Sequence, residues 1–341
     1  MTKRFIATFT AAFAAALSIG SPLPAAAQGA PKAAMLLPGS INDQSWNAVG
    51  YAGLTKIKEL GFDISYSENV PAADHVNAMR DYARRGASLI IGHSGRFLSA
   101  EQRVAPEFPK VQFITAAGSV GYPPNVMSID FNNIHFGCQL GALMALMSKT
   151  GKIGGVYGLE GLPTTIDQVG SFRLCAQKAR PGVEVTVIYI KDIEDAAAAK
   201  EAAFSLVSAG ADGLVGQLNA AQSGLIQAAK EKGVWVAGRS YENTAIAPEQ
   251  VLTNIIEKWP EMYAAAAMDV KAGKLSGVYK VYGYDTPNST GAALGYSPER
   301  AFNPKVPDAV VAALKSLQND LGSGKLKLKP TRDDARGGKT T

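Results

Sequence analysis

The sequence predicts an α/β fold made of two lobes, each a parallel sheet with helices on both faces. Short apolar segments that read as buried strands alternate with helical segments along most of the chain, the pattern of parallel strands joined by crossover helices. About 314 residues follow the N-terminal apolar segment, which is enough for two domains. A long amphipathic stretch at 132–149 separates two series of strands, so we expect the chain to change lobe there.

The expected strands are short apolar runs bounded by Gly, Pro or polar residues. They cover 33–37, 63–67, 89–92, 112–115, 126–130, 153–157, 184–189, 213–216, 234–237 and 251–253. Helical patterns lie between most of them, among them 74–85, 195–209 and 221–232. The first series predicts an N-terminal lobe at 28–131 and the second a C-terminal lobe at 132–253. The lysine-rich end, 321–341, is expected to form a basic tail.

The first residues have the organisation of a secretory signal peptide. Lys3 and Arg4 precede an apolar segment at 5–19, and three alanines at 25–27 offer an A-x-A cleavage site. A membrane anchor is the alternative, but the apolar run is shorter than the ~20 residues that a spanning helix needs. We therefore expect residues 1–27 to be removed and the mature chain to be exported.

The two cysteines stand in helix-like stretches with apolar neighbours. Cys138 lies in G-C-Q-L-G-A-L-M-A-L-M and Cys175 in S-F-R-L-C-A-Q-K-A. An exported chain allows a disulfide, but a domain of this size does not depend on one, and apolar surroundings suit a buried thiol. The pattern favours buried free thiols, with a disulfide as the alternative.

The net charge of +5 is carried by the ends of the chain. Without the signal peptide and the tail from Ser323 onward, the body holds 26 basic and 27 acidic residues. Nucleic-acid binding needs basic charge clustered on a folded face. No nucleic-acid partner is therefore expected.

Catalytic signatures are missing from the sequence. The histidines are His75, His93 and His135, and none has a metal-ligand spacing such as H-x-x-x-H. Neither a G-x-S-x-G elbow nor a G-x-x-x-x-G-K-[ST] loop occurs. A nucleoside hydrolase-like enzyme, which would need an aspartate cluster at one strand end, is the disfavoured alternative. We expect a binding protein that uses no cofactor and no metal.

The segment 33–60 is the most informative part of the chain. After the first strand and a Pro-Gly turn, Asn42 and Asp43 stand where a helix N-cap belongs. In the helix that follows, Asp43, Asn47 and Tyr51 are four residues apart and share one stripe. The stripe begins at the carboxyl edge of the strand, where open α/β sheets bind their ligands. These residues therefore predict a ligand site.

This segment and four others resemble the basic membrane protein family of the purine-nucleoside-receptor type. The matching runs are G-S-I-N-D-Q-S-W-N-A-V-G-Y-A-G-L at 39–54, M-S-K-T-G-K-I-G-G-V at 147–156, G-A-D-G-L-V-G at 210–216, S-G-L-I-Q-A-A-K-E-K-G-V-W-V-A-G at 223–238 and V-L-T-N-I-I at 251–256. Members are substrate-binding proteins of ABC importers with the type I periplasmic-binding fold. The resemblance thus implies a periplasmic monomer that binds a purine base or nucleoside and partners ABC permease subunits.

The resemblance also shapes two expectations about topology and anchoring. In the type I fold the chain crosses back after the second strand series, which implies that 254–320 completes the N-terminal lobe. Many relatives are lipoproteins with a cysteine just after the signal peptide. This chain has no cysteine there, so we expect a free periplasmic protein.

Site residues carried over from the family begin on the first helix. Asp43 is expected to accept hydrogen bonds from the ligand, with helix capping as its alternative role. Tyr51 stands where relatives stack an aromatic ring on the purine, although a core position is the alternative. Trp46 takes the Phe position of the S-F-N motif, where a core role is favoured over a ligand contact. Asn42 replaces an acidic residue of the family, and Asn47 is expected to orient Asp43.

Further candidates follow later strands. His93 and Asp130 lie at strand ends in the first lobe, whereas Glu160, Gln217 and Asn219 follow strands in the second. Small residues around His93 would let a ligand approach the backbone. Amide side chains such as those of Gln217 and Asn219 can both donate and accept hydrogen bonds, which suits a nucleobase edge.

Three positions depart from the family and bear on the ligand. Ser240 replaces the aspartate that binds ribose in relatives, Glu257 replaces a lysine, and Asp285 is a candidate to supply the missing carboxylate. The departures favour a free base over a nucleoside. A sugar- or signal-molecule-binding protein of the same fold, serving an importer or a membrane sensor, remains the main alternative.

Overall fold

The computed structural model describes residues 1–2, 29–287 and 289–337. Apart from Met1 and Thr2, the expected signal peptide lies outside the described residues, as does the chain end from 338. Within the described part, no helix combines the length and apolarity needed to cross a membrane.

The first lobe is a six-stranded sheet in the order β11-β5-β4-β3-β1-β2, and every pairing in it is parallel. Its strands are β1 (Lys32–Leu36), β2 (Asp63–Ser67), β3 (Ala87–Gly92), β4 (Gln112–Ala116), β5 (Val126–Phe131) and β11 (Tyr279–Tyr282). Its helices are α1 (Trp46–Glu59), α2 (His75–Arg84), α3 (Leu98–Val104) and α8 (Trp259–Lys271), with short 3₁₀ turns at Ala72–Asp74, Gly95–Phe97 and Ala105–Glu107.

The second lobe repeats this plan with a six-stranded sheet in the order β12-β10-β9-β8-β6-β7. Its strands are β6 (Lys152–Gly158), β7 (Glu184–Ile190), β8 (Gly213–Gln217), β9 (Trp235–Ser240), β10 (Val251–Glu257) and β12 (Ala292–Gly295), the last antiparallel to β10. Its helices are α4 (Asn133–Met147), α5 (Pro163–Ala179), α6 (Ala196–Ser208), α7 (Gln222–Lys232), α9 (Asp308–Gly322) and α10 (Arg332–Arg336), with a 3₁₀ turn at Thr244–Ile246. The predicted fold class is confirmed.

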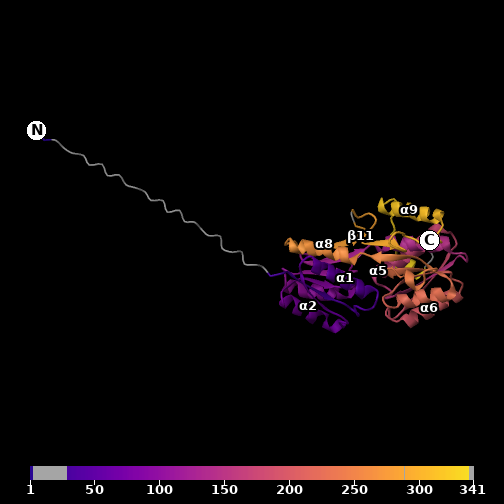
Figure 1. Ribbon diagram of the computed structural model, residues 1–341, viewed down its shortest axis with the longest axis horizontal. Helices are drawn as coiled ribbons and strands as arrows, with labels where there is room; N and C mark the ends of the chain where they lie inside the picture. Colours follow the sequence, from indigo (N-terminus) through magenta and orange to yellow (C-terminus); the bar gives the residue numbers. More distant parts are fainter. Residues whose placement is uncertain (3–28, 288, 338–341) are drawn as a thin grey trace.

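The chain passes between the lobes after β5, after β10 and between β11 and β12. Figure 1 shows α8 beside α1 in the first lobe and α9 over the second. The expectation that 254–320 belongs to the first lobe needs correction. Residues up to Glu257 belong to β10, β12 pairs with β10, and α9 packs on α4. Only α8 and β11 return to the first lobe, because only they find partners there, in α1 and β5.

Cys138 and Cys175 form a disulfide, which corrects the expectation of free thiols. The reason is how closely α4 and α5 pack. A Cβ on Gly137 would lie 2.3 Å from Ser171 Oγ, and one on Gly141 would lie 2.1 Å from the carbonyl oxygen of Phe172. These glycines let the two helix backbones meet, and the cysteine Cα atoms are 5.0 Å apart, within the range that a disulfide spans.

The predicted basic tail is folded onto the second lobe as far as the structure describes it. Leu326 and Leu328 pack against the apolar cluster around the disulfide. Helix α10 begins with a capping box between Thr331 and Asp334 and packs on α5. Arg336 then forms an ion pair with Glu160 at 2.7 Å. The tail therefore covers part of the α4–α5 layer.

Glu101 on α3 is fully buried in the first lobe, which makes stability depend on pH. Burial raises the pKa of its carboxyl group from 4.5 to about 8, while hydrogen bonds from Thr115 and the Gly92 N–H oppose the shift. Between these pH values the native state holds a proton that the unfolded chain loses, so the stability conferred by the protonated form is lost as pH rises from about 4.5 to about 8. The loss is about 5 kcal/mol.

Glu101→Gln should therefore weaken the pH dependence of stability, because glutamine mimics the protonated carboxyl group at every pH. Urea unfolding at pH 5 and pH 8.5 measures it. We expect the wild type to lose more stability across this interval than the variant does. Equal losses would mean that Glu101 does not hold a proton in the native state.

Candidate ligand-binding site

A cavity of about 160 Å³ lies between the lobes, at the carboxyl ends of strands from both sheets. The first lobe contributes Pro38, Trp46, Ser94, Arg96 and Ala117, and the second contributes Gly158, Leu159, Leu162, Thr164, Thr165, Asp192, Ile193, Glu194, Gln217, Leu218, Asn219 and Arg239. The lobes touch beside it, where Ser45 Oγ lies 3.5 Å from Ser240 Oγ. The site is therefore a partly open cleft between two lobes, the usual setting for a small ligand.

Trp46 brings an indole ring to this cavity from the first turn of α1. His93 stacks on the ring at a centroid distance of 4.2 Å, and the indole N–H donates to the His93 carbonyl oxygen at 2.8 Å. Behind it, Trp259 meets the ring edge-on. His93 and Trp259 therefore hold the indole ring in one orientation where it lines the cavity.

His93 supports Trp46 and does not line the cavity. Its Nε2 lies 2.8 Å from the Trp46 carbonyl oxygen, which can only accept, so Nε2 carries the proton and Nδ1 accepts from the Tyr263 hydroxyl at 2.5 Å. Burial lowers the pKa of His93 to about 4. The imidazole is therefore neutral at physiological pH, and its role is to hold Trp46 in place.

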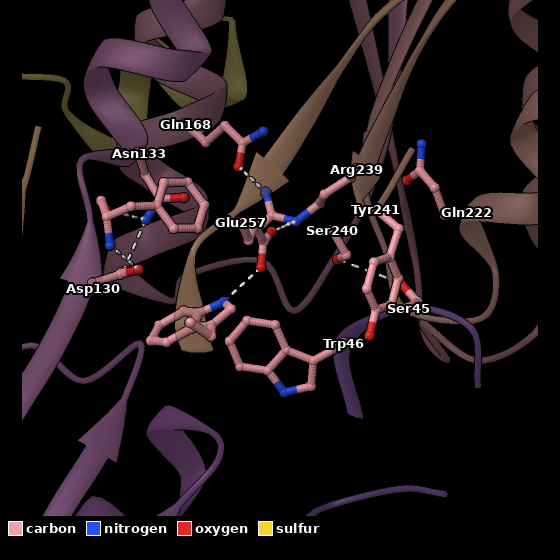
Figure 2. Close-up of polar contacts among 12 residues, drawn as sticks. Ser45, Trp46, Asp130, Asn133, Gln168, Gln222, Arg239, Ser240, Tyr241 and Glu257 are labelled. Carbon is pink, nitrogen blue, oxygen red and sulfur yellow. Dashed lines mark hydrogen bonds and ion pairs between the residues drawn. The ribbon is translucent and has the colours of Figure 1, made fainter. Parts of the chain in front are cut away.

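Arg239, at the end of β9, forms the centre of a buried polar network at the cavity (Figure 2). Its Nε lies 2.9 Å from Glu257 Oε1, and its Nη1 donates to Gln168 Oε1 at 2.7 Å. Glu257 Oε2 in turn accepts from the Trp259 indole at 2.7 Å. Burial raises the pKa of Glu257, whereas Arg239 and the indole hydrogen bond oppose the shift. A buried ion pair thus connects Arg239 at the cavity with the end of β10, where the chain crosses to the first lobe.

Asp43 and Asn47 hold the start of α1. Asp43 Oδ1 accepts from the backbone N–H groups of Ser45 and Ala48 at 2.9 Å, and Oδ2 accepts from the backbone and side-chain nitrogens of Asn47 at 2.8 Å. Asn47 Oδ1 accepts from the Gly39 N–H. The Asp43 carboxylate therefore caps the helix. Neither residue is among those that line the cavity.

Other expected site residues lie at varying distances from the cavity. Gln217 and Asn219 line it, and Asn219 donates to Glu194. Tyr51 meets Tyr66 edge-on at 5.0 Å and, like the exposed Asn42, does not line the cavity.

The remaining candidates also stand outside the lining. Asp130 is buried at the end of β5, where it accepts from the Phe131 N–H and from Asn133, and burial raises its pKa well above the ordinary value. Asp285 is exposed on the segment that crosses between β11 and β12. Glu160 pairs with Arg336, and Ser240 faces Ser45 at the contact between lobes.

The backbone is strained where three strands reach the cleft. Ala117 after β4, Leu159 after β6 and Ser240 at the end of β9 have φ values of 50°, 53° and 67°. Side chains other than glycine rarely adopt this left-handed conformation, and such strain concentrates at functional sites. Ala117 and Leu159 both line the cavity, so the strain supports a functional role for this edge.

Sequence reasoning placed the loop after β6 at the cleft through Glu160, but it missed the role of Arg239 and the acidic pair Asp192 and Glu194. One signal could have found them, because Arg239 lies near the carboxyl end of β9 and the acidic pair follows β7, so all three reach the same sheet edge. Among the residues described by the structure, no group of three or more His, Cys, Asp or Glu side chains is arranged to hold a metal.

Two lobes joined by three crossing segments, with a polar and aromatic cavity between them, are the architecture of a solute-binding protein. The chain belongs to the Bmp family, the PnrA-like ABC transporter substrate-binding proteins, whose family model matches residues 30–286. The resemblance inferred from the sequence is thus confirmed. The family is one of substrate-binding proteins, in agreement with the expectation that the chain is not an enzyme.

Individual proteins are also similar to this chain. The transcriptional activator protein med of Bacillus subtilis is 27% identical over 257 residues, which are 75% of this chain and 80% of that protein. A purine-binding protein of Brucella abortus is 28% identical over 212 residues, covering 62% of this chain and 59% of that protein. A solved ABC transporter solute-binding protein from Conexibacter woesei matches with a TM-score of 0.70 at 26% identity and covers 88% of this chain and 99% of that one.

Proposed function

We propose that this protein binds a purine in the cavity between its lobes and delivers it to the permease of an ABC importer. The observation that carries the proposal is the Trp46 indole, which lines the cavity and is held by His93 on one face. The purine stacks on the opposite face. Aromatic stacking is worth roughly 1–3 kcal/mol per base. The purine-binding relative supports the same ligand class.

A free base fits the polar groups better than a nucleoside. Ser240, where relatives carry the ribose-binding aspartate, is turned toward Ser45. Glu257 forms an ion pair with Arg239 and accepts a hydrogen bond from the Trp259 indole, and Asp285 does not line the cavity. None of these three side chains offers a free carboxylate to ribose hydroxyls. Of the two carboxylates that line the cavity, Glu194 accepts from Asn219 and from the Ala220 N–H, and Asp192 accepts from the Glu194 N–H. We therefore propose a purine base as the preferred solute.

Calorimetric titration with hypoxanthine, inosine and glucose tests the ligand class. We expect the base to bind most tightly and glucose not to bind. Trp46→Ala should weaken base binding by about ten- to a hundredfold, the equivalent of the stacking energy. Tyr51→Ala is the matched control, because it removes a ring of the same helix that lies outside the cavity, and it should change affinity by less than about twofold.

Two results would contradict this assignment. Binding of glucose without binding of either purine compound would favour the sugar-binding alternative. A loss of affinity in Tyr51→Ala, with no loss in Trp46→Ala, would show that the purine stacks on Tyr51 and not on Trp46.

We also infer that the protein works in the periplasm. The N-terminal Lys-Arg, apolar segment and A-x-A site support export. The Cys138–Cys175 disulfide supports the same compartment, because disulfides persist in oxidising surroundings. Recovery of the full chain from the membrane fraction, uncleaved near Gln28, would overturn this inference.

A further inference from the structure

We infer that the cleft selects purines with an oxo group at position 6 over 6-aminopurines, and that Arg239 and Gln217 make the selection. The inference rests on the proposed purine ligand and specifies its chemistry. It concerns a residue, Arg239, whose cavity-facing donors have no protein partner among the described residues.

The Arg239 guanidinium is held in one position. It is 6% exposed, forms an ion pair through Nε with Glu257, donates a hydrogen bond through Nη1 to Gln168, and lies 5.4 Å from the centre of the Phe131 ring. Figure 2 shows it between Gln168 and Glu257. Glu257 also balances its charge. The site therefore presents directed N–H donors without a net charge, which suits a neutral heterocycle better than an anion.

Donors of Arg239 remain for a ligand. A guanidinium carries five N–H groups, and two of its nitrogens, Nε and Nη1, are engaged by the protein. Nη2 makes no hydrogen bond to any residue that the structure describes, although Arg239 lines the cavity. Nη2 and the second hydrogen of Nη1 are therefore available as a two-donor fork for a ligand at the cavity that Arg239 lines.

Gln217 lies on the strand next to that of Arg239. It is the last residue of β8, and Arg239 is near the end of β9, the neighbouring strand of the sheet. Both residues line the cavity. Gln217 Oε1 is buried and has no hydrogen-bond partner among the described residues. Such a buried acceptor is costly unless a ligand supplies a donor.

This pair of groups matches one kind of purine edge. Arginine forms bidentate contacts with the adjacent O6 and N7 acceptors of a 6-oxopurine. A 6-aminopurine presents an N–H₂ donor at position 6, which would meet the donors of Arg239 and leave them unpaired. The N1–H group of an oxopurine, beside O6, also provides the donor that Gln217 Oε1 lacks, whereas N1 of a 6-aminopurine is an acceptor. A site discriminates more strongly against a ligand that leaves its buried polar groups unpaired than against one that only fits an apolar pocket less well.

Calorimetric titration of the wild type with hypoxanthine and adenine tests the inference. Hypoxanthine should bind about ten- to a hundredfold more tightly than adenine, as expected when one ligand leaves buried donors unpaired. Gln217→Leu removes an amide that makes no hydrogen bond to the described residues, and it should lower hypoxanthine affinity about tenfold with little effect on adenine. Arg239→Lys keeps the charge but removes the fork, and it should reduce the preference to about threefold or less.

Thermal melts of each variant verify that it is folded, and Gln217→Leu keeps the test valid should Arg239→Lys fail to fold. Equal or tighter binding of adenine by the wild type would overturn the inference and leave the purine proposal standing. An unchanged preference in folded Arg239→Lys or in Gln217→Leu would also overturn it. Binding of glucose with no binding of either base would overturn both proposals.

Discussion

Replacing Glu257 by leucine should lower the free energy of unfolding by about 3–5 kcal/mol, the usual cost of removing one partner of a buried ion pair. The Glu257 side chain is fully buried and that of Arg239 is 6% exposed. Without Glu257 the guanidinium would stay buried with its main counter-ion gone. The Trp259 indole N–H would also lose its acceptor. Urea unfolding followed by far-ultraviolet circular dichroism measures the change.

The double variant Arg239→Met/Glu257→Leu is the matched control for this charge. Replacing both members by apolar side chains of similar size removes the unpaired charge, and such replacements are often neutral or stabilising. We expect the double variant to recover at least half of the stability that Glu257→Leu loses. A double variant as unstable as the single one would mean that the two side chains are not energetically coupled.

Most strands were predictable from the sequence because parallel strands covered on both faces are continuous apolar runs. The run expected at 153–157 is β6 (Lys152–Gly158), and the one expected at 184–189 is β7 (Glu184–Ile190). The strands that were missed, β11 and β12, are four residues long and lie at sheet edges. They depend on pairing with β5 and β10, which no local pattern records.

The site was predictable in its position and only partly in its residues. Gln217 and Asn219 could be found because they stand at and just after the end of a strand that reaches the cleft. For Trp46 a core role was favoured over a ligand contact, since a large aromatic side chain on a packed helix is usually buried. Asp43 could not be assigned between capping and binding, since both roles call for a carboxylate at the same place. Arg239 was missed because its role arises from tertiary contacts, with Glu257 on β10 and Gln168 on α5.

The disulfide was open to prediction only in part. The sequence shows two cysteines on two helices, but their separation depends on how those helices pack. The close approach of α4 and α5 is made possible by Gly137 and Gly141, which flank Cys138 on one helix. A pair of glycines four residues apart beside a cysteine is a signal for such contact, since residues at this spacing share a helix face.

Removing the disulfide should lower the free energy of unfolding of the second lobe by about 3–4 kcal/mol. The bond joins residues 37 positions apart, and closing a loop of this size in the unfolded chain accounts for a stabilisation of that order. It also joins the two helices under Leu321 and the folded tail. The variant Cys138→Ala/Cys175→Ala, unfolded in urea, provides the measurement.

The reduced wild-type protein is the matched comparison, because it keeps both sulfur atoms and loses only the bond. We expect it to be nearly as unstable as the double alanine variant, and reoxidation should restore the original midpoint. Trp235 on β9 belongs to the lobe that contains the bond, whereas Trp46 and Trp259 belong to the other. Three variants, each with one tryptophan kept and the other two replaced by phenylalanine, report the unfolding of each lobe by fluorescence. If the lobes unfold separately, reduction should shift the urea midpoint more for the variant that keeps Trp235 than for the other two. An unfolding midpoint that reduction leaves unchanged would show that the packing of α4 on α5, and not the covalent bond, stabilises this layer.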